Sequence, residues 1–501
     1  MTAGRRLSPV ERALRVFTDV QPGEAGTALL LTANVFLLLC AYSLMKVLRE
    51  PLILAGGGAE VKSYSAAGQA LLLLVAVPVY GALANRFPRR RLINIVTTFF
   101  LGCLIGFFAL AKTSAPIGVF FYIWLGIFNV MVIAQFWSFA NDLYTSDEGK
   151  RLFPIVAFGQ SCGAVVGAYL AGRAIDWFGL YPIFLVAAVF LVAGTLLTNV
   201  VDVRERKRTE AARSAMESTA MLPAATREVR LESGAFKIAD LEAEMRRAEE
   251  AKAAPAAAPP AAPAPPAPAP SKEAGAASTG NAFQLVFRSR YLFMIAIMIL
   301  LLNWVNSTGE YILSRTVSRA ATATVEATHL AGDAADAEKK VFIGKFYSNY
   351  QLGVNLLGLF LQLFVVSRIL KYLGVRIAVM ILPSIALFGY GVLAFLPVLS
   401  LVRWVKTAEN ATDYSIQNTV RQVLFLPTTR EQKYKAKQAI DSFFVRAGDV
   451  FSAGLVFVGT TYLSLHTQAF ALFNILLVAA WLWIALRVGK EHARLTAATA
   501  D

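Results

Sequence analysis

Apolar segments long enough to cross a lipid bilayer make up most of this chain of 501 residues. About twelve such runs can be marked, each near the ~20 residues that a helix needs to span the hydrocarbon core. They are predicted at 27–48, 64–84, 92–111, 116–140, 152–175, 180–201, 288–312, 344–367, 375–396, 398–420, 438–462 and 467–488. Because backbone polar groups in lipid must be satisfied internally, the runs predict an all-α membrane protein of about twelve transmembrane helices.

A long polar segment divides these spans into two sets of six. Within it, Ile238 to Glu250 is predicted to form a short helix, and Ala251 to Pro270 is almost entirely Ala and Pro, a composition that cannot build a packed core. The expected organisation is an N-terminus at 1–26, a six-helix half at 27–201, a linker at 202–287, a second six-helix half at 288–488 and a tail at 489–501. The linker is the candidate contact for a cytosolic partner. The outer segment from Arg315 to Lys340 is expected to be a mobile cap or an exposed helix.

Basic residues fall in alternate loops, which predicts the orientation of the chain. With twelve spans, the N-terminal arginines, the loop around Arg86 to Arg91, the loop around Arg430 to Lys437 and the tail all lie on one side. Both termini are therefore predicted to be cytoplasmic, in the inner (plasma) membrane. The net charge of +15 is explained by this topology, so nucleic acid is not an expected partner. Residues 1–23 lack the apolar core and cleavage site of a secretory signal peptide.

Ionisable side chains inside the apolar spans are the main functional signal, since charges at membrane depth are costly and usually line a solute or ion path. In the span 398–420, Lys406, Glu409 and Asp413 fall on one helix face. Gln417 and Arg421 continue that face to the cytoplasmic end. The stripe is either part of a substrate path or a salt-bridge ladder that neutralises itself, and both alternatives require it to face the bundle interior.

The next span contains Arg446 and Asp449, whose spacing allows mutual pairing. An arginine at that depth can also bind a phosphate or carboxylate through two hydrogen bonds. Further candidates for substrate binding lie at span ends or beside small residues: Lys46, Arg49, Asp142, Gln160 and Glu310. Lys46, Arg49 and Glu310 fall near the outer interface, where long side chains can also snorkel to the headgroups, and Asp142 can instead cap a helix.

Small residues recur every fourth position in the span 152–175, at Gly159, Gly163, Gly167 and Ala171. This spacing lets two membrane helices approach closely, and we interpret the stripe as a packing surface.

Several function classes are not indicated by the sequence. No phosphate-binding loop of the G-x-x-x-x-G-K-[ST] type is present, so an ATP-driven pump is not expected. Neither a Ser/His/Asp arrangement nor a metal-ligand pattern is visible, and Cys40, Cys103 and Cys162 all lie in apolar spans. We therefore expect no enzymatic activity, no cofactor and no metal, and transport energy from exchange or an ion gradient.

Two levels of resemblance refine this interpretation. The six-plus-six layout and the loop Gly81-Ala-Leu-Ala-Asn85-Arg86-Phe-Pro-Arg89-Arg90-Arg91 resemble the major facilitator transporters and their loop signature G-x-L-a-D-R-x-G-R-R, with Asn85 in place of Asp and Pro88 in place of Gly. The resemblance implies that Arg86, Arg89, Arg90 and Arg91 form a conformational latch. Plain positive-inside anchoring explains the same arginines equally well.

Three blocks resemble the nucleotide translocase family, whose members exchange ATP and ADP. The first block is Lys46-Val-Leu-Arg49-Glu50-Pro-Leu-Ile-Leu-Ala55. The second has two parts, Phe136-Trp137-Ser-Phe139-Ala140-Asn141-Asp142 and Asp147-Glu148-Gly-Lys150-Arg151-Leu-Phe153-Pro154. The third is Lys435-Ala-Lys437-Gln-Ala439-Ile440-Asp441. The resemblance implies that Arg49 and Lys437 serve nucleotide phosphates, and that Asp142 and Glu310 match acidic positions of the family. Arg49, Glu50 and Asp142 each differ from the residue usual in the family, which points to a distant branch.

The sequence therefore predicts a secondary transporter of a small anionic solute, with nucleotides as the leading class and alternating access as the mechanism. One alternative is a proton-coupled carrier of another organic anion or drug, in which Glu409, Asp413 or Asp449 would titrate. The other is a membrane scaffold that does not transport and whose linker recruits a cytosolic partner.

Overall fold

The computed structural model describes residues 11–12, 15, 18, 20–21, 24–113, 115–144, 146–220, 282–429 and 431–498. Contacts divide the chain into two units. The first comprises Met1–Thr27 and Asn199–Gly280, and the second comprises Ala28–Thr198 and Asn281–Asp501. In the first unit, the Thr27 hydroxyl donates to Glu205 Oε1 over 2.5 Å. The second unit contains helices from both predicted halves and holds the candidate site.

All regular structure in the described residues is helical. The helices before the linker are α2 (Ala25–Arg86), α3 (Arg89–Ala111), α4 (Gly118–Phe128), η1 (Asn129–Ile133), α5 (Ala134–Leu143), α6 (Ser146–Phe178) and α7 (Ile183–Ala220). The elements labelled η are short π-helical segments, in which one extra residue widens the turn. The helix α7 extends well past the predicted end of its span at residue 201. The Ala/Pro stretch and the short helix predicted for the linker lie outside the described residues.

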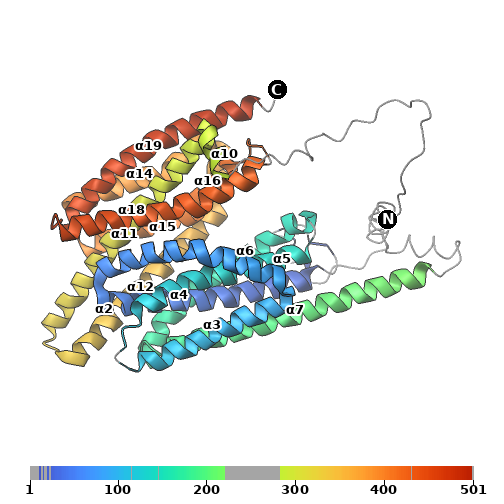
Figure 1. The fold of residues 1–501 in the computed structure, drawn as a ribbon, viewed down its shortest axis with the longest axis horizontal. Coiled ribbons are helices and arrows are strands. Elements are labelled where there is room, and N and C mark those ends of the chain that lie inside the picture. The colour runs from blue at the N-terminus through green and yellow to red at the C-terminus, as the bar shows by residue number, and fades with distance from the viewer. Residues whose placement is uncertain are drawn as a thin grey trace. The chain divides into compact units, whose positions relative to one another are not determined.

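The helices after the linker carry the second predicted half. They are α10 (Ala282–Arg288), α11 (Arg290–Ala327), α12 (Gly332–Phe360), η2 (Leu361–Val365), α13 (Val366–Tyr372), α14 (Gly374–Phe395), α15 (Leu399–Thr412), η3 (Asp413–Gln417), α16 (Asn418–Leu424), η4 (Gln432–Ala436), α17 (Lys437–Ala439), η5 (Ile440–Phe444), α18 (Val445–Thr461) and α19 (Thr467–Ala498). Figure 1 shows α11, α14, α18 and α19 in yellow to red, and α11 and α14 both pack against α19.

Ten helices in the described part of the chain are long and apolar enough to cross a membrane. The helix α2 counts once, although it contains the predicted spans 27–48 and 64–84 on either side of a break at Gly58. The continuous helix from α15 to α16 is not among the ten, because it carries several charges, including Lys406, Glu409 and Asp413. The expected number of twelve spans therefore stays a prediction.

Two local features of the sequence determine how the site helices begin and bend. Gly58 adopts φ 75°, a left-handed conformation that glycine reaches without steric cost, and it changes the direction of α2 after Pro51. The Ser289 side chain accepts a hydrogen bond from the backbone N–H of Leu292 and so caps α11. The segment Arg315 to Lys340 is a helical hairpin, because α11 continues to Ala327 and α12 begins at Gly332.

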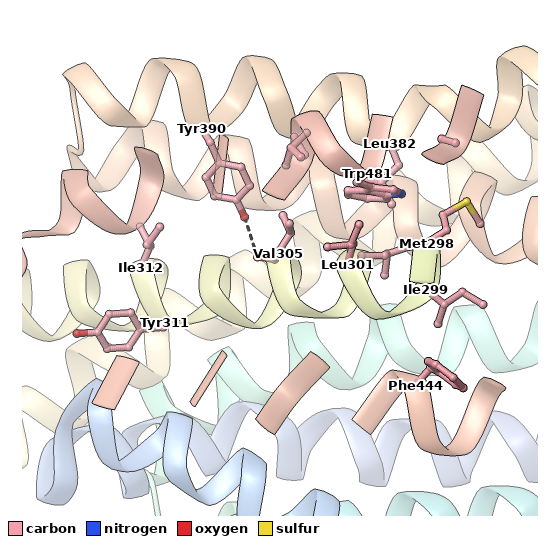
Figure 2. Packing of buried hydrophobic residues seen from close by; sticks show 14 of the residues in the cluster. Met298, Ile299, Leu301, Val305, Tyr311, Ile312, Leu382, Tyr390, Phe444 and Trp481 are labelled. Atoms are coloured by element: carbon pink, nitrogen blue, oxygen red, sulfur yellow. Dashed lines mark hydrogen bonds between the residues drawn. The ribbon is translucent and has the colours of Figure 1, made fainter. Parts of the chain in front are cut away.

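The buried core of the second half forms around α11. Val305, Met298 and Leu301 on α11 pack with Trp481 of α19 and Tyr390 of α14 (Figure 2). The Tyr390 hydroxyl lies 3.4 Å from the carbonyl oxygen of Val305 and 3.0 Å from Glu409 Oε2. This apolar core, together with the hydrogen bonds of the Tyr390 hydroxyl, thus holds α11, α14 and α15 in fixed positions.

The predicted small-residue stripe is a helix contact. A Cβ atom placed on Gly163 would overlap the carbonyl oxygen of Phe36 on α2, and one on Gly167 would lie 2.7 Å from the carbonyl oxygen of Cys40. The backbones of α6 and α2 therefore approach closely, as small residues at this spacing allow. The Ser43 hydroxyl, which donates to the carbonyl of Ala164 over 2.9 Å, adds a hydrogen bond between the same helices.

Replacing Gly163 with leucine tests this contact. We expect Gly163→Leu to destabilise the protein by at least about 1–3 kcal/mol, because the side chain would have to displace α2 backbone. Gly106→Leu on α3 is the control, since no heavy atom lies within 4 Å of a Cβ there. The unfolding midpoint of the purified protein in detergent is the measurement, and equal midpoints for the two variants would contradict the close packing of α2 and α6.

Candidate functional site

Two adjoining cavities lie between the helices of the second unit. The smaller has a volume of about 290 Å³ and the larger about 850 Å³. Both are within the range of small-molecule sites. They share the lining residues Tyr42, Lys46, Gln351 and Tyr414, which therefore mark the junction between them.

Charged side chains gather around the smaller cavity. Its lining contains the cations Lys46, Arg49, Lys62 and Arg446 and the carboxylates Glu50, Glu310 and Asp449. Among the described residues, four cations thus face three carboxylates, so this part of the lining has one excess positive charge when all are ionised.

The helix α2 supplies one charged wall of this cavity. Tyr42, Lys46 and Arg49 follow one another at helical spacing and so share a face. The Arg49 guanidinium lies over the ring of Tyr122, 4.4 Å from its centroid. It also donates to Glu50 Oε1, with Nε at 3.0 Å. A cation stacked on an aromatic ring and bonded to a carboxylate is held in one position.

Six ionisable side chains form an unbroken sequence of opposite charges, which we call the charge chain. Its members, in order, are Arg49, Glu50, Lys62, Glu310, Lys406 and Glu409. Lys62 Nζ lies 2.6 Å from Glu50 Oε2 and 3.9 Å from Glu310 Oε2. The chain thus passes from α2, before the linker, to α11, after it.

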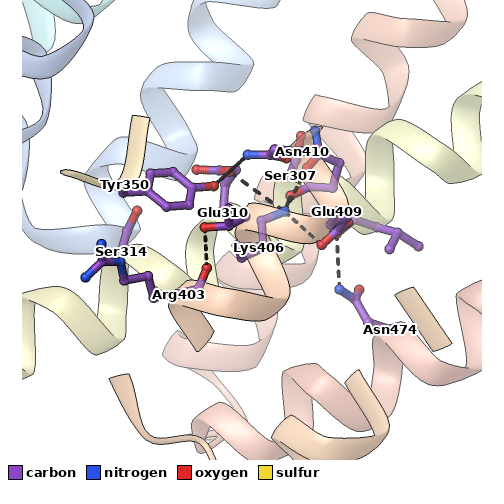
Figure 3. Close-up of polar contacts among 12 residues, drawn as sticks. Ser307, Glu310, Ser314, Tyr350, Arg403, Lys406, Glu409, Asn410 and Asn474 are labelled. Atoms are coloured by element: carbon purple, nitrogen blue, oxygen red, sulfur yellow. Dashed lines mark hydrogen bonds and ion pairs between the residues drawn. The ribbon is translucent and has the colours of Figure 1, made fainter. Parts of the chain in front are cut away.

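On the other side, Lys406 lies between two carboxylates (Figure 3). Its Nζ is 3.8 Å from Glu310 Oε1 and 3.0 Å from Glu409 Oε2, and it donates to Asn306 Oδ1 over 2.8 Å. Lys406 is fully buried, whereas 29% of the Glu310 side chain is exposed. Glu310 is therefore the member of this group that faces the cavity, with Lys406 and Glu409 behind it.

The charge chain divides unequally between the two halves. Before the linker, it has two cations and one carboxylate, and after the linker it has one cation and two carboxylates. Each part alone carries one net charge, and the two charges have opposite sign. The contact between Lys62 and Glu310 is the link that makes the chain neutral as a whole.

Lys46 differs from the other cavity cations. Among the described residues, no carboxylate lies within salt-bridge distance of its ammonium, whose partners are the hydroxyl of Tyr414 at 3.4 Å and the ring of the same residue. Because Lys46 lines both cavities, an unpaired positive charge lies at their junction. This arrangement suits an anionic group of a ligand.

The predicted pair Arg446 and Asp449 is present and lines the smaller cavity. Arg446 Nη1 lies 3.5 Å from Asp449 Oδ2, and Asp449 Oδ1 accepts a hydrogen bond from Ser307 over 2.6 Å. Because Arg446 is partly exposed and lines the cavity, its guanidinium is accessible to a second acceptor there.

The cavities are closed at one end by contacts between α6 and α12. Lys345 Nζ pairs with Asp176 Oδ1 at 2.9 Å, and the Ser348 hydroxyl donates to the carbonyl of Ala168 over 2.8 Å. The last contact along this line is the hydrogen bond from Asn355 to the carbonyl of Ala164. Beyond it, residues of α6, α12 and η2 line the larger cavity: Pro154, Ala157 and Phe158 of α6, Gly358 and Leu359 of α12, and Gln362 of η2. The two helices therefore meet at one end and separate at the other.

The predicted substrate-binding residues fall into three groups. Lining a cavity are Lys46, Arg49, Gln160, Glu310, Arg446 and Asp449. Lys406 and Glu409 lie behind the cavity wall and hold Glu310. Outside both cavity linings are Asp142, Asp413, Arg421 and Lys437.

The members of the last group lie elsewhere in the bundle. Asp142 is exposed on α5, and Asp413 lies in η3. Lys437 Nζ pairs with Asp441 Oδ2 at 2.7 Å, and Arg421 Nε lies 3.7 Å from the same carboxylate. Since α16 and α17 both belong to the second half, this pairing does not join the two halves.

Among the predicted latch residues, Arg86, Arg90 and Arg91 are exposed between α2 and α3, and the side chain of Arg89 lies outside the described part of the chain. Arg91 lies over the ring of Phe87, 5.8 Å from its centroid. Their role as a latch stays a prediction.

Sequence reasoning missed Lys62 and gave Glu50 no site role. Lys62 falls between the predicted spans 27–48 and 64–84, where a loop was expected, whereas the structure continues α2 through this region after the break at Gly58. The three consecutive glycines that precede it were the available signal for a bend rather than a loop. The cavity tyrosines were missed as well, since apolar and aromatic positions in a span look alike.

Comparisons with known proteins agree on the fold. Residues 30–408 match the family model described as Major Facilitator Superfamily. A curated relative, ADP,ATP carrier protein 2 of Chlamydia trachomatis serovar D, is 21% identical over 91% of this chain and 86% of its own length. The solved nucleoside transporter NupG has a TM-score of 0.54 at 12% identity, covering 91% of this chain and 98% of that one. The peptide transporter POT in complex with sulfate has a TM-score of 0.57 at 13% identity, covering 97% and 99%.

Replacing Lys406, which forms a buried ion pair with Glu409, tests the charge chain. We expect Lys406→Met to destabilise the protein by about 3–5 kcal/mol, because it leaves Glu409 buried without its cation. The double variant Lys406→Met/Glu409→Gln should recover much of that loss, since the glutamine carries no charge and can still accept a hydrogen bond from Tyr390. Unfolding midpoints in detergent are the measurement. A double variant no more stable than the single one would contradict the pairing.

Proposed function

Since this chain belongs to the major facilitator superfamily and is a membrane transporter of that type, we propose that it carries a small anionic solute, with nucleotides as the leading class. Transport would be secondary, by exchange of one nucleotide for another, as in ATP for ADP. The proposal keeps the inner membrane and cytoplasmic termini expected from the basic loops. The position of the larger cavity fits this orientation, because its lining residues Pro154 and Gln362 lie close in sequence to the basic residues Arg151 of α6 and Arg368 of α13.

The observation that carries the proposal is the unpaired ammonium of Lys46 at the junction of the two cavities. Lys46 is partly exposed to the cavities and has no carboxylate partner among the described residues, so an anionic ligand that reaches it gains an ion pair that the protein does not already supply. Arg446 faces the same cavity and can bind a phosphate or carboxylate through two donors. The excess positive charge of the lining favours an anion over a cation or a neutral sugar.

Two observations favour a nucleotide among anions. The curated relative that aligns with most of this chain has the name of an ADP,ATP carrier. The junction also places the rings of Tyr42 and Tyr414 beside Lys46, and aromatic rings next to a cation suit a ligand that joins a planar ring to phosphates.

The charge chain supplies a physical basis for alternating access. In the present conformation, α6 meets α12 at one end and Lys62 contacts Glu310, so the opposite charges of the two halves cancel. Opening that end would separate these charges. An anion bound near Lys62 and Lys46 could replace Glu310 as the partner of Lys62, and only such differential binding shifts the balance between the two conformations.

Uptake into liposomes tests the substrate and the two cavity cations. With ADP inside and labelled ATP outside, we expect uptake by the native protein and loss of it in Lys46→Gln and Arg446→Gln. Losing one charge-assisted contact should weaken binding roughly 10- to 100-fold. Arg173→Gln is the matched control, because Arg173 is an exposed arginine outside both cavity linings.

The outcomes separate the alternatives. Uptake that needs internal ADP supports exchange. Uptake that collapses with a protonophore points to the proton-coupled carrier. Normal uptake by Lys46→Gln would contradict the role of the junction. Absence of uptake for a panel of anions, together with a phenotype on deleting Ala251 to Pro270, would favour the scaffold.

A disulfide across the closed end tests alternating access directly. A Cβ placed on Gly172 of α6 would lie 3.4 Å from the Cβ of Ser348 on α12, close to the separation of a natural disulfide. We expect the double variant Gly172→Cys/Ser348→Cys, made after replacing Cys40, Cys103 and Cys162 with alanine, to lose uptake on oxidation and to regain it on reduction.

The two single-cysteine variants control for the substitutions and should be insensitive to the oxidant. Gel mobility after cleavage of the linker measures whether the cross-link has formed. Full transport by protein shown to be cross-linked would rule out opening of this end during the cycle.

A further inference from the structure

The two cavities differ sharply in chemistry. Among the described residues, the smaller is lined by seven charged side chains, whereas Lys46 is the only Asp, Glu, Lys, Arg or His residue in the lining of the larger one. The larger cavity is lined instead by carboxamides, small hydroxyl groups, apolar side chains and aromatic rings. A ligand that fills both would need an anionic part and an uncharged part.

Carboxamides of the larger cavity are available to a ligand. Within the described part of the chain, no protein hydrogen-bond partner is found for the side chains of Asn129, Gln160, Gln351, Gln362 and Asn418, all of which line it. Each carboxamide has two donors and an acceptor oxygen. Gln351 is buried, Asn129 and Gln160 are partly exposed, and Gln362 and Asn418 are exposed, so these amides are accessible to a molecule that enters the cavity.

The helices place these amides on several sides of the space. Asn129 begins η1, Gln160 lies on α6, Gln351 on α12, Gln362 in η2 and Asn418 at the start of α16. Two of the five thus lie in π-helical segments and a third directly follows one, and such segments are frequent at functional sites. Hydrogen bonds from several directions suit a ligand with both donors and acceptors around its edge.

Aromatic rings supply the flat surfaces. Trp137 and Phe158 line the larger cavity from α5 and α6, and Tyr42 and Tyr414 line it at the junction. Rings of this kind stack on planar heterocycles, whereas the surrounding amides can bond to the edges of such a ring.

We propose that the larger cavity binds the uncharged body of the substrate, a planar heterocycle with hydrogen-bond donors and acceptors on its edge, while the smaller cavity holds the anionic head. Because Lys46 lines both cavities, we infer that one molecule occupies both, with its anionic head in the smaller cavity and its uncharged body in the larger one. Gln160 and Gln362 are then selectivity residues for the body. This inference rests on the proposed anion transport and specifies the substrate class for the same site.

Binding of two probes that share only the anionic head tests the inference. ADP and inorganic pyrophosphate are titrated into the full-length protein in detergent by calorimetry. We expect Gln160→Leu and Gln362→Leu each to weaken ADP binding roughly three- to tenfold, the range for one neutral hydrogen bond, without a measurable change for pyrophosphate. Lys46→Gln should weaken both ligands. Gln468→Leu is the control, because Gln468 is exposed at the start of α19 and lines neither cavity.

Each outcome supports or overturns the inference. Weaker binding of ADP alone in the two glutamine variants supports it, and the smaller substitution Gln160→Ala repeats the test if the leucine variant is unstable. Equal affinity of the native protein for ADP and pyrophosphate, or equal loss of both in the glutamine variants, overturns it. Binding of pyrophosphate without ADP overturns it while leaving anion transport intact. A folded native protein that binds neither ligand contradicts the proposed nucleotide transport as well.

Discussion

The cost of placing charge inside a membrane protein is the constraint on which this structure depends. Isolated ions at that depth are unfavourable, so the chain arranges six of them in alternating order from Arg49 to Glu409. The arrangement is neutral only as a whole. Since its two parts belong to different halves, the same contact that satisfies the charges also holds α2 against α11.

Close packing elsewhere makes this contact specific. Gly163 and Gly167 let α6 lie directly on α2, and the apolar core around Val305 and Tyr390 keeps α11 and α15 in register. Each half packs its own helices closely, and the two halves also contact each other. The helix α6 packs on α12, and Ile53 and Leu54 of α2 belong to the same buried apolar cluster as residues of α11.

The difference in chemistry between the two cavities follows from the same cost of burying charge. Ionised groups cluster where they can pair across the halves, and the remaining space is lined by neutral amides and aromatic rings. Lys46 is the exception, because it lies at the boundary and has no carboxylate partner among the described residues. The charge of Lys46 and the accessible amides together fit a ligand with an anionic head and a polar, uncharged body.

The sequence by itself determined the all-helical membrane fold and the packing stripe of α6. It also identified several cavity residues, including Lys46, Glu310 and Arg446, because apolar length, small-residue spacing and charge within a span are local properties. Only the tertiary structure decided that Glu409 lies behind the wall, that Arg421 and Lys437 pair with Asp441, and that Lys62 bridges the halves. The periodicity of a sequence predicts which residues share a face of a helix, but it does not predict which other helix packs against that face. The pairing of charges depends on how helices distant in the sequence are brought together and on a single glycine that redirects α2.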